Sequence, residues 1–393
     1  MSAGKDNPPT NIARAGRIRI GQHRMPAASC VRRVFDGILD RAWFANQGPL
    51  VRQLDAEFGG VVGTQQAVCL TNDVLAVALS TRALDLRGRV AVPARASLAL
   101  VQGIALGGAT PVLIDIDPST GALDLEALER CTSAHAAVPF EALAAVPTTQ
   151  CPELSDELVD FATRRGVPML VEASEVLGSS LRLPEHAIGI YSFDGRHVVG
   201  AGQAAIAVTD SQLLAERLRW LRSFHGGSSV ELDQPRLNGK LAEAPAALIL
   251  AGLEELDARI GANTILFDRY RAGFARMPRV RVLVPPAGVC SNHGSLEVEF
   301  EQRSDAAWTT EALDQRGIDS ERPLLPDQLI RAASRGASFA AAMAAAGPWP
   351  KAESSGERRL RLPLGAGVEP QAVDAIVELV CAGLGGQPLR QAS

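Results

Sequence analysis

Three side chains have the clearest capacity for chemistry: the imidazole of His197 and the carboxyl groups of Glu172 and Glu175. A histidine has an unperturbed pKa of about 6.5, so His197 suits proton transfer near neutral pH. The two carboxylates could hold the histidine tautomer or act as a second acid–base group. A lysine that could form an imine is absent from residues 6–239. These groups therefore predict acid–base chemistry rather than imine chemistry.

The sequence around these residues predicts strands that would bring them together. The apolar run 168–172 ends in Glu172 and predicts a buried strand, and residues 188–193 and 204–209 predict two more. In open parallel sheets, functional groups lie at the carboxyl ends of strands and on the loops that follow. Glu172 and the loop 193–203, which carries Arg196 and His197, fall at such places.

The rest of the first 240 residues repeats this alternation of strands and helices. Further strands are predicted at 67–70, 89–93 and 111–117, and helices at 50–59, 74–84, 96–107, 154–165 and 211–224. Strands that alternate with helices of this length imply a mostly parallel sheet covered on both faces. The predicted fold class is therefore α/β for this part of the chain.

The pattern changes after about residue 240 and predicts a smaller α+β domain. Its expected elements are a helical segment 242–277, strands at 280–284, 295–300 and 359–363, and a terminal helix 369–384. The strand at 295–300 alternates cleanly and is interpreted as half-exposed. We therefore expect a flexible arm over 1–30, a large domain over 31–240 and a C-terminal domain over 241–393.

Composition excludes several classes of function. The chain has 393 residues, of which 47% are hydrophobic and 21% charged, with a net charge of −5. This balance gives no reason to expect nucleic acid or a membrane as partner, and no apolar run is long enough to cross a bilayer. The six cysteines form no CxxC pair, which favours reduced thiols over a metal site or disulfides. The sequence predicts a cytoplasmic protein that acts on a small molecule and binds no metal.

Four segments carry a resemblance to a known family. Residues 44–51 (FANQGPLV), 108–118 (GATPVLIDIDP), 193–209 and 237–243 (LNGKLAE) follow one another in the order and spacing of that family's motifs. The chain thereby resembles the DegT/DnrJ/EryC1/StrS family of pyridoxal-phosphate sugar aminotransferases over about residues 35–385. The branch that acts at C4 of nucleotide-linked 4-keto-6-deoxysugars is the most similar.

The resemblance implies a fold, an assembly and a cofactor site. Family members have the fold-type-I aminotransferase architecture, with a mostly parallel seven-stranded large domain, and form homodimers that share the active site. The gapless match over 193–209 places His197 where the family has the lysine that forms a Schiff base with pyridoxal phosphate. Ser192 matches a hydroxyl that binds the cofactor phosphate, and Asn238 matches an asparagine that reaches it from the neighbouring subunit. Both could still bind an anion.

Several positions depart from the family pattern. In the phosphate loop, two residues after Asn72, Val74 stands where the family has a hydroxyl that binds the phosphate. Ser97 replaces the aromatic residue that stacks on the pyridine ring. Glu172 is one methylene longer than the aspartate that keeps the pyridine nitrogen protonated. Glu175 stands where a histidine or glutamine lies against the cofactor.

These departures weaken every contact that would hold pyridoxal phosphate. Stacking is worth about 0.5–1.5 kcal/mol beyond area burial, and a charge-assisted hydrogen bond about 1.5–3 kcal/mol. Losing both, together with the imine, removes several kcal/mol, and about 1.4 kcal/mol is a factor of ten in affinity. We therefore expect no cofactor, with pyridoxal or pyridoxamine phosphate bound non-covalently as the lesser alternative.

Three functions remain open on the sequence. The first is a repurposed, cofactor-independent acid–base enzyme of dehydratase, isomerase or cyclase type, acting on a sugar-like or other polar secondary metabolite. Arg95, Arg196 and His225 would bind an anionic substrate in this enzyme, and Asn72 and Ser97 are further candidates. The alternative is a non-catalytic partner of an active aminotransferase paralogue. The third is a dehydratase that uses pyridoxamine phosphate, with His197 as its base.

Overall fold

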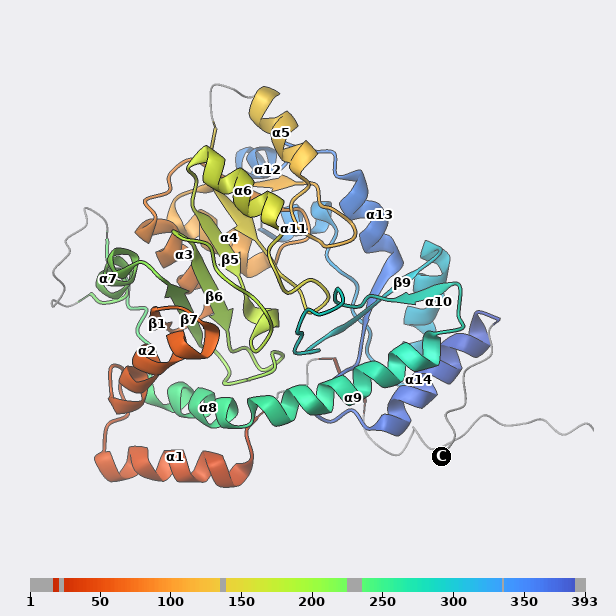
Figure 1. The fold of residues 1–393 in the computed structure, drawn as a ribbon, viewed down its shortest axis with the longest axis horizontal. Helices are drawn as coiled ribbons and strands as arrows, with labels where there is room; N and C mark the ends of the chain where they lie inside the picture. The colour runs from red at the N-terminus through yellow and green to blue at the C-terminus, as the bar shows by residue number, and fades with distance from the viewer. Residues whose placement is uncertain (1–16, 21–24, 135–138, 225–234, 334–335, 386–393) are drawn as a thin grey trace, which may run out of the picture.

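The computed structural model describes residues 17–20, 25–134, 139–224, 235–333 and 336–385. These residues form two β-sheets with helices around them, a larger sheet toward one end of the molecule and a smaller one toward the other (Figure 1). Helix α9 (Leu256–Phe274) runs along one side of the molecule, below both sheets in the view of Figure 1.

The larger sheet has seven strands in the order β1-β7-β6-β5-β4-β2-β3. Only β7 runs antiparallel to its neighbours, and the remaining pairs are parallel. The strands are β1 (Gln66–Leu70), β2 (Arg89–Pro93), β3 (Thr110–Ile114), β4 (Phe140–Ala145), β5 (Met169–Glu172), β6 (Ile188–Ser192) and β7 (Ala205–Thr209). This confirms the predicted mostly parallel seven-stranded sheet.

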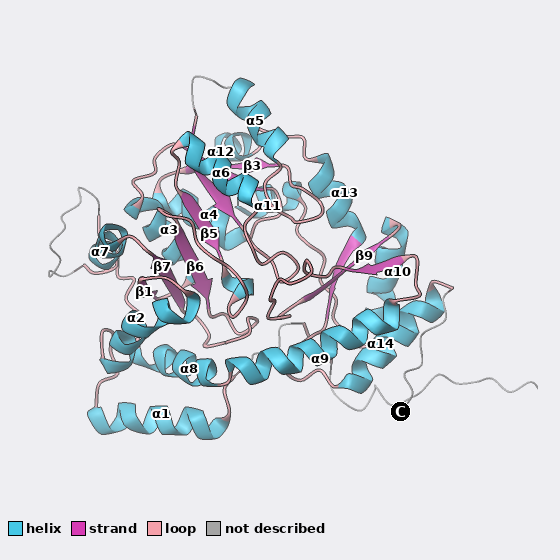
Figure 2. Ribbon diagram, in the orientation of Figure 1, coloured by secondary structure: helices cyan, strands magenta, loops and turns pink. Residues whose placement is uncertain are grey.

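Helices cover both faces of this sheet, as near-continuous apolar strands require (Figure 2). One face packs against α2 (Pro49–Val62), α5 (Leu125–Ala134), α6 (Asp156–Arg165) and α8 (Glu243–Glu254). The other packs against α3 (Asp73–Ala83), α4 (Leu98–Gly107), α7 (Gln212–Leu221), α11 (Pro326–Ala333), α12 (Ala337–Met343) and α13 (Pro350–Arg358). Successive residues of β1 alternate between the two faces, as the pleat demands.

The smaller sheet is antiparallel, in the order β10-β9-β8. Its strands are β8 (Val280–Val282), β9 (Leu296–Phe300) and β10 (Arg359–Leu362). Its apolar face packs against α9, α10 (Arg303–Asp314) and α14 (Pro370–Gly383) around the buried side chain of Tyr270. Because α8, α11 and α12 pack on the larger sheet, the C-terminal residues contribute to both cores, and the domain boundaries stay a prediction.

Three observations add to the sequence analysis. Strand β4, with the sequence FEALAA, was not predicted, because an alanine-rich run has weak strand propensity. The interpretation of β9 as half-exposed is wrong, because all five of its residues are buried. Of the predicted N-terminal arm, residues 1–16 and 21–24 lie outside the described part, and Ile18 forms a β-bridge with Ile318.

Helix N-termini follow directly after strands of the larger sheet and fix the loops near their carboxyl ends. Asn72 caps α3 by accepting a hydrogen bond from the Leu75 amide at 2.9 Å. Ser97 caps α4 in the same way, accepting from the Leu100 amide at 3.0 Å. Such caps stabilise a helix start by about 1 kcal/mol, so these two loops are held in place locally. No helix in the described ranges is both long and apolar enough to span a bilayer.

Close packing of α3 against α4 yields a stability prediction. A Cβ atom at Gly103 would lie 2.4 Å from Val77 Cβ, whereas a Cβ at Gly60 in α2 would meet no atom within 4 Å. We expect Gly103→Ala to lower the free energy of unfolding by about 1–3 kcal/mol through overpacking. Gly60→Ala is the matched control and should be neutral or stabilising by about 0.4–1 kcal/mol. Urea unfolding curves of both variants check this, and equal midpoints would contradict it.

Candidate active site

A cavity of about 520 Å³ lies at the carboxyl ends of the parallel strands, between the larger sheet and strands β9 and β10. Six of the predicted site residues line it: Arg95, Ser97, Glu172, Glu175, Arg196 and His197. They come from three separate chain segments, after β2, β5 and β6. The structure thus brings together the acid–base candidates and two of the predicted anion-binding arginines.

Glu172 is the last residue of β5, and its carboxyl group has no ion pair within the described residues. Ser97 Oγ donates a hydrogen bond to Glu172 Oε2 at 2.9 Å. Burial, followed by the nearby charges of Asp73 and Glu175, raises the pKa of Glu172 to about 7 despite this bond. Neither Arg95 nor Arg196 pairs with Glu172. Glu172 holds a proton in a large fraction of molecules at neutral pH.

His197 lies in the turn after β6, where its backbone N–H donates to the Asp194 carbonyl at 3.0 Å. Burial lowers the pKa of its imidazole, and Arg196 and Arg361 act in the same direction. The charges of Glu175 and Asp194 oppose this decrease only in part. The imidazole is therefore neutral at pH 7 and able to accept a proton. Within the described residues, neither Glu172 nor Glu175 makes a hydrogen bond to it.

Glu175 lies in the short 3-10 helix η2 (Ser174–Val176) and forms an ion pair with Arg361 Nη1 at 2.9 Å. Its other oxygen, Oε2, is buried and has no hydrogen-bond partner among the described residues. The Glu175 side chain is partly buried at the cavity wall. Glu175 and Arg361 connect the end of the larger sheet to strand β10 across the cavity.

The predicted anion-binding arginines are both paired. Arg95 Nη2 lies 3.0 Å from Glu297 Oε1 on β9, and both side chains are largely buried. Arg196 is exposed and lies 3.4 Å from Asp194 and 3.9 Å from Glu321. Neither arginine is a free cation at the cavity wall, so an anion would bind beside an existing ion pair.

Sequence reasoning missed Glu297, Arg359 and Arg361, which are contributed by β9 and β10. Burial alone would raise the pKa of Glu297, but the guanidinium groups of Arg95, Arg361 and Arg359 hold it below its usual value. The signal was present in the sequence. Alternating glutamates on one strand and alternating arginines on another predict complementary charged faces.

Three further candidates do not line the cavity. Ser192 is buried, and its Oγ accepts a hydrogen bond from the Asp194 amide at 3.3 Å. Asn72 serves as the cap of α3, and Asn238 is exposed to solvent. His225 lies outside the described residues. The predicted contribution of Asn238 from a second subunit stays a prediction.

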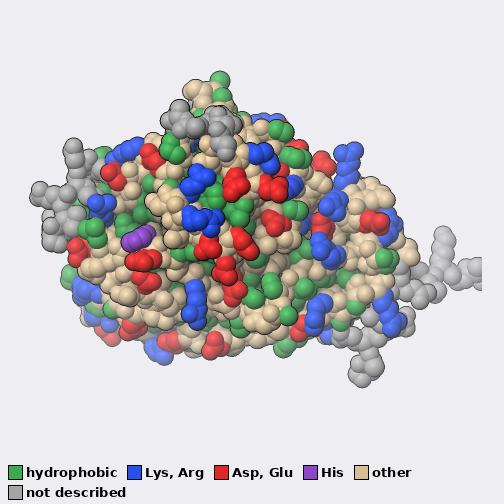
Figure 3. All heavy atoms as spheres, turned by 45° about the horizontal axis from the view of Figure 1, so that its top comes forward, with side chains coloured by type: hydrophobic (Ala, Val, Ile, Leu, Met, Phe, Trp, Pro, Cys, Tyr) green, Lys and Arg blue, Asp and Glu red, His purple; other side chains and the backbone are tan. Residues whose placement is uncertain are grey.

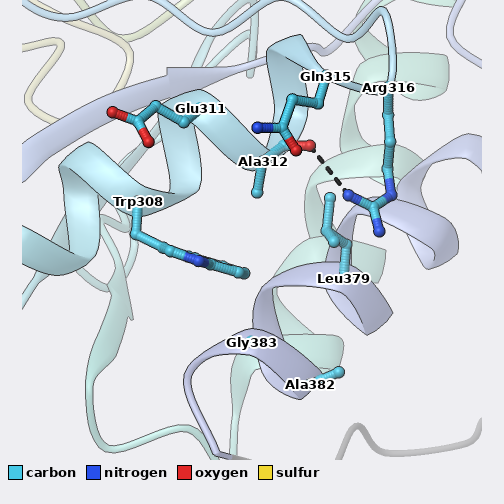
Figure 4. A pocket seen from close by; sticks show the side chains of 8 residues that line it. All are labelled: Trp308, Glu311, Ala312, Gln315, Arg316, Leu379, Ala382 and Gly383. Carbon is cyan, nitrogen blue, oxygen red and sulfur yellow. Dashed lines mark hydrogen bonds between the residues drawn. The ribbon is translucent and has the colours of Figure 1, made fainter.

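A second hollow, of about 370 Å³, lies between α10 and α14 (Figure 4). The indole of Trp308 lies over Gly383, and Arg316 donates to the Ala312 carbonyl at 3.2 Å. None of the predicted site residues lines it. The cavity beside Glu172 is therefore the candidate active site.

Acidic and basic side chains are intermixed on the face of the molecule drawn in Figure 3, rather than gathered by sign. That face offers no single-sign patch of the kind that binds nucleic acid. Within the described residues, no group of three histidine, cysteine or acidic side chains is arranged to hold a metal ion.

Comparison with solved structures identifies the class of fold. A structure of DesI in the presence of its TDP-sugar product has a TM-score of 0.79 and 25% identity, covering 93% of this chain and 92% of that one. DesV from S. venezuelae in complex with a ketimine intermediate has a TM-score of 0.80 and 24% identity, covering 94% and 99%. The chain has the fold-type-I aminotransferase architecture.

Sequence comparison identifies the family. A profile of the DegT/DnrJ/EryC1/StrS aminotransferase family matches residues 30–381. The chain belongs to this family. It is 27% identical over 343 residues to dTDP-3-amino-3,4,6-trideoxy-alpha-D-glucose transaminase from Streptomyces venezuelae, over 84% of this chain and 87% of the relative. Members and structural neighbours are sugar aminotransferases that use pyridoxal or pyridoxamine phosphate.

The site differs from such a cofactor site at three points. Position 197 carries an imidazole, which cannot form an imine. The first amides of α3, where the phosphate loop would bind its anion, are already occupied: Val74 N–H donates to Asp73 Oδ1 at 2.8 Å and Leu75 N–H to Asn72 Oδ1 at 2.9 Å. The carboxylate of Asp73 would also repel a phosphate there. The residues present do not fit covalently held pyridoxal phosphate.

The raised pKa of Glu172 predicts how stability depends on pH. The folded chain keeps this proton up to a pH of about 7, whereas the unfolded chain releases it near the ordinary pKa of 4.5. Between these two pKa values, the folded state binds more protons than the unfolded state. The contribution of Glu172 to the free energy of unfolding therefore falls as pH rises through this range. We expect Glu172→Gln to gain stability over the wild type across this range, by up to about 3 kcal/mol.

Urea unfolding of both proteins at a series of pH values from about 5 to about 8 measures this difference. Glu353→Gln on α13 is the matched control, because Glu353 is exposed and has no ion pair within the described residues. A difference between Glu172→Gln and wild type that stays constant with pH would contradict the raised pKa.

Proposed function

We propose that this chain is a cofactor-independent acid–base enzyme of dehydratase, isomerase or cyclase type, acting on a polar, sugar-like metabolite in secondary metabolism. The observation that carries the proposal is the presence of both Glu172 and His197 in the lining of one cavity. Burial raises the pKa of the first to about 7 and lowers the pKa of the second. Near neutral pH, one group can donate a proton and the other can accept one.

The roles follow from the contacts. His197 is the base, because its imidazole is neutral and hydrogen-bonded to no carboxylate among the described residues. Glu172 is the acid, and Ser97 fixes its orientation through the 2.9 Å hydrogen bond to Oε2. Glu175 is a positioning residue whose negative charge stabilises the imidazolium formed after proton transfer. Proton transfer by positioned groups of this kind contributes about 10²–10⁴ in rate.

The cavity also suits a sugar in size and polarity. Its volume of about 520 Å³ falls in the range usual for small-molecule sites, about 300–1,000 Å³. Hydroxyl and amide groups of Thr148, Thr149 and Gln150 line the side that faces Ser295. Such groups can exchange hydrogen bonds with sugar hydroxyls. A homodimer that completes the site from a second subunit is part of this proposal.

The proposal predicts that the protein does not retain pyridoxal phosphate. After incubation with the cofactor and gel filtration, we expect no cofactor absorbance to remain with wild-type protein, and none to be fixed by borohydride reduction. His197→Lys restores the missing amine and is the matched positive control for access to position 197. A cofactor band that survives gel filtration of the wild type would contradict the cofactor-independent mechanism.

The proposal also predicts proton transfer to carbon. In D₂O, we expect wild-type protein to exchange the protons beside the ketone of dTDP-4-keto-6-deoxyglucose or 2-keto-3-deoxygluconate for deuterium. The loss of these proton signals is measured by ¹H NMR. His197→Ala should slow the exchange by about 10²–10⁴, because it removes the base. Glu353→Gln controls for preparation effects. Absence of exchange with both ketones, or equal rates for wild type and His197→Ala, would overturn the acid–base assignment.

A further inference from the structure

The smaller sheet turns a charged face toward the cavity. Strand register sets Arg361 opposite Glu297 and Arg359 opposite Glu299, and alternation along each strand puts these four side chains on one face. The opposite face, with Leu296, Val298 and Leu360, packs into the apolar core of the C-terminal part.

Three guanidinium groups converge on the cavity wall at this face. Arg359 lies 3.7 Å from Glu297, Arg95 lies 3.0 Å from the same carboxylate, and Arg361 pairs with Glu175. We refer to Arg95, Arg359 and Arg361 as the arginine trio. Burial lowers the pKa of Arg359, the nearby Arg95 adds to this effect, and Glu297 and Glu299 counter it only in part.

The carboxylates that face the trio are shared among several arginines. Arg95 and Arg359 both approach the single carboxylate of Glu297, and Arg361 pairs with Glu175. Glu299 lies 3.9 Å from Arg359 but is also paired with Arg281 and Arg358, and the charge of Glu321 acts on Arg361. The three guanidinium groups therefore compete for these carboxylates.

The trio also has donors without acceptors. Among the described residues, Arg95 Nε and Arg359 Nε are buried and have no hydrogen-bond partner. Arg359 is only 3% exposed, so solvent cannot easily satisfy its guanidinium. Buried donors of this strength are normally paired, and an unpaired one costs free energy. Both nitrogens belong to residues that line the same cavity.

The opposite part of the cavity has the reverse polarity. Asp73 and Glu172 have no ion pair within the described residues, and their mutual repulsion helps to raise the pKa of Glu172. Between these parts, the single positive charge of Arg196 faces two carboxylates, those of Asp194 and Glu321. A ligand with one anionic end would therefore orient itself, placing that end at the trio and its polar remainder beside Glu172 and His197.

We infer that the arginine trio is a carboxylate-binding subsite and that the substrate is a sugar acid or a related polar carboxylic acid. Guanidinium groups bind planar carboxylates by charge-assisted hydrogen bonds, and a carboxylate could accept from the two buried Nε donors that have no partner among the described residues. This inference rests on the proposed function only in taking the cavity as the substrate site.

Binding of two sugars that differ only in charge tests the subsite independently of turnover. D-glucuronate carries the carboxylate, and D-glucuronamide has nearly the same shape without the charge. By isothermal titration calorimetry, we expect wild-type protein to bind the acid at least about tenfold more tightly than the amide, because charge-assisted hydrogen bonds are roughly twice as strong as neutral ones. The preference should weaken as salt concentration rises.

Two substitutions should change the preference for glucuronate over glucuronamide in opposite directions. Arg95→Gln removes one guanidinium group of the trio, together with its unpaired Nε donor, and should abolish the preference. Glu297→Gln removes a competing carboxylate and should increase it severalfold. Arg322→Gln, at an exposed position that lines the cavity outside the trio, is the matched control and should leave it unchanged. Circular dichroism of each variant confirms that it is folded, and the opposite signs of the two effects separate a charge effect from a general loss of structure.

Each other outcome overturns the subsite. Equal affinity for acid and amide, or binding of neither, excludes a carboxylate site at the trio. Tighter binding of glucose 6-phosphate than of glucuronate would replace the carboxylate class by phosphates. If proton exchange with a ketone is observed while the trio shows no preference, the acid–base function stands and the subsite is wrong. If the trio shows the preference without any exchange, the subsite stands and the proposed function is wrong.

Discussion

The desolvation of the Glu172 carboxyl group is the physical constraint on which the proposed chemistry depends. The residue ends a strand of the larger sheet, and its carboxyl group accepts a hydrogen bond from Ser97 but has no ion pair among the described residues. Ionising it there is costly, so its pKa rises to about 7. In the sugar aminotransferases, a carboxylate at this place has a pyridinium as partner. Without that partner, the same position becomes an acid suited to neutral pH.

The charged face of the smaller sheet is the second consequence of burying ionisable groups. Glu297 and Glu299 are buried, and each is surrounded by more than one arginine. Buried ion pairs of this kind add little net stability, because the cost of desolvation offsets most of the attraction between the charges. They do fix geometry, since the Glu175–Arg361 and Arg95–Glu297 pairs connect the larger sheet to β9 and β10 around the cavity.

The sequence predicted the fold better than it predicted the site. Apolar runs such as β5 and the capped start of α3 are local signals, and the structure confirms both. Strand β4 lacks such a signal, because FEALAA has no β-branched residue and is a strand only through its neighbours β2 and β5. Glu172 and His197 were found because they follow strands. The Glu175–Arg361 pair joins residues far apart in the chain, which no local pattern encodes.

The departures from the family are correlated rather than scattered. At the start of α3, the Asp73 carboxylate accepts a hydrogen bond from the Val74 amide. Ser97 donates a hydrogen bond to the carboxyl group of Glu172, and His197 stands where the family has its lysine. Asp73 and Ser97 thereby each satisfy a neighbouring polar group. Simple loss of function would leave buried groups unsatisfied at these points, because nothing would select their partners. Among the described residues that line the cavity, Glu175 Oε2 and the Nε atoms of Arg95 and Arg359 have no hydrogen-bond partner. These unpaired atoms support the proposal that the cavity binds a ligand other than the cofactor.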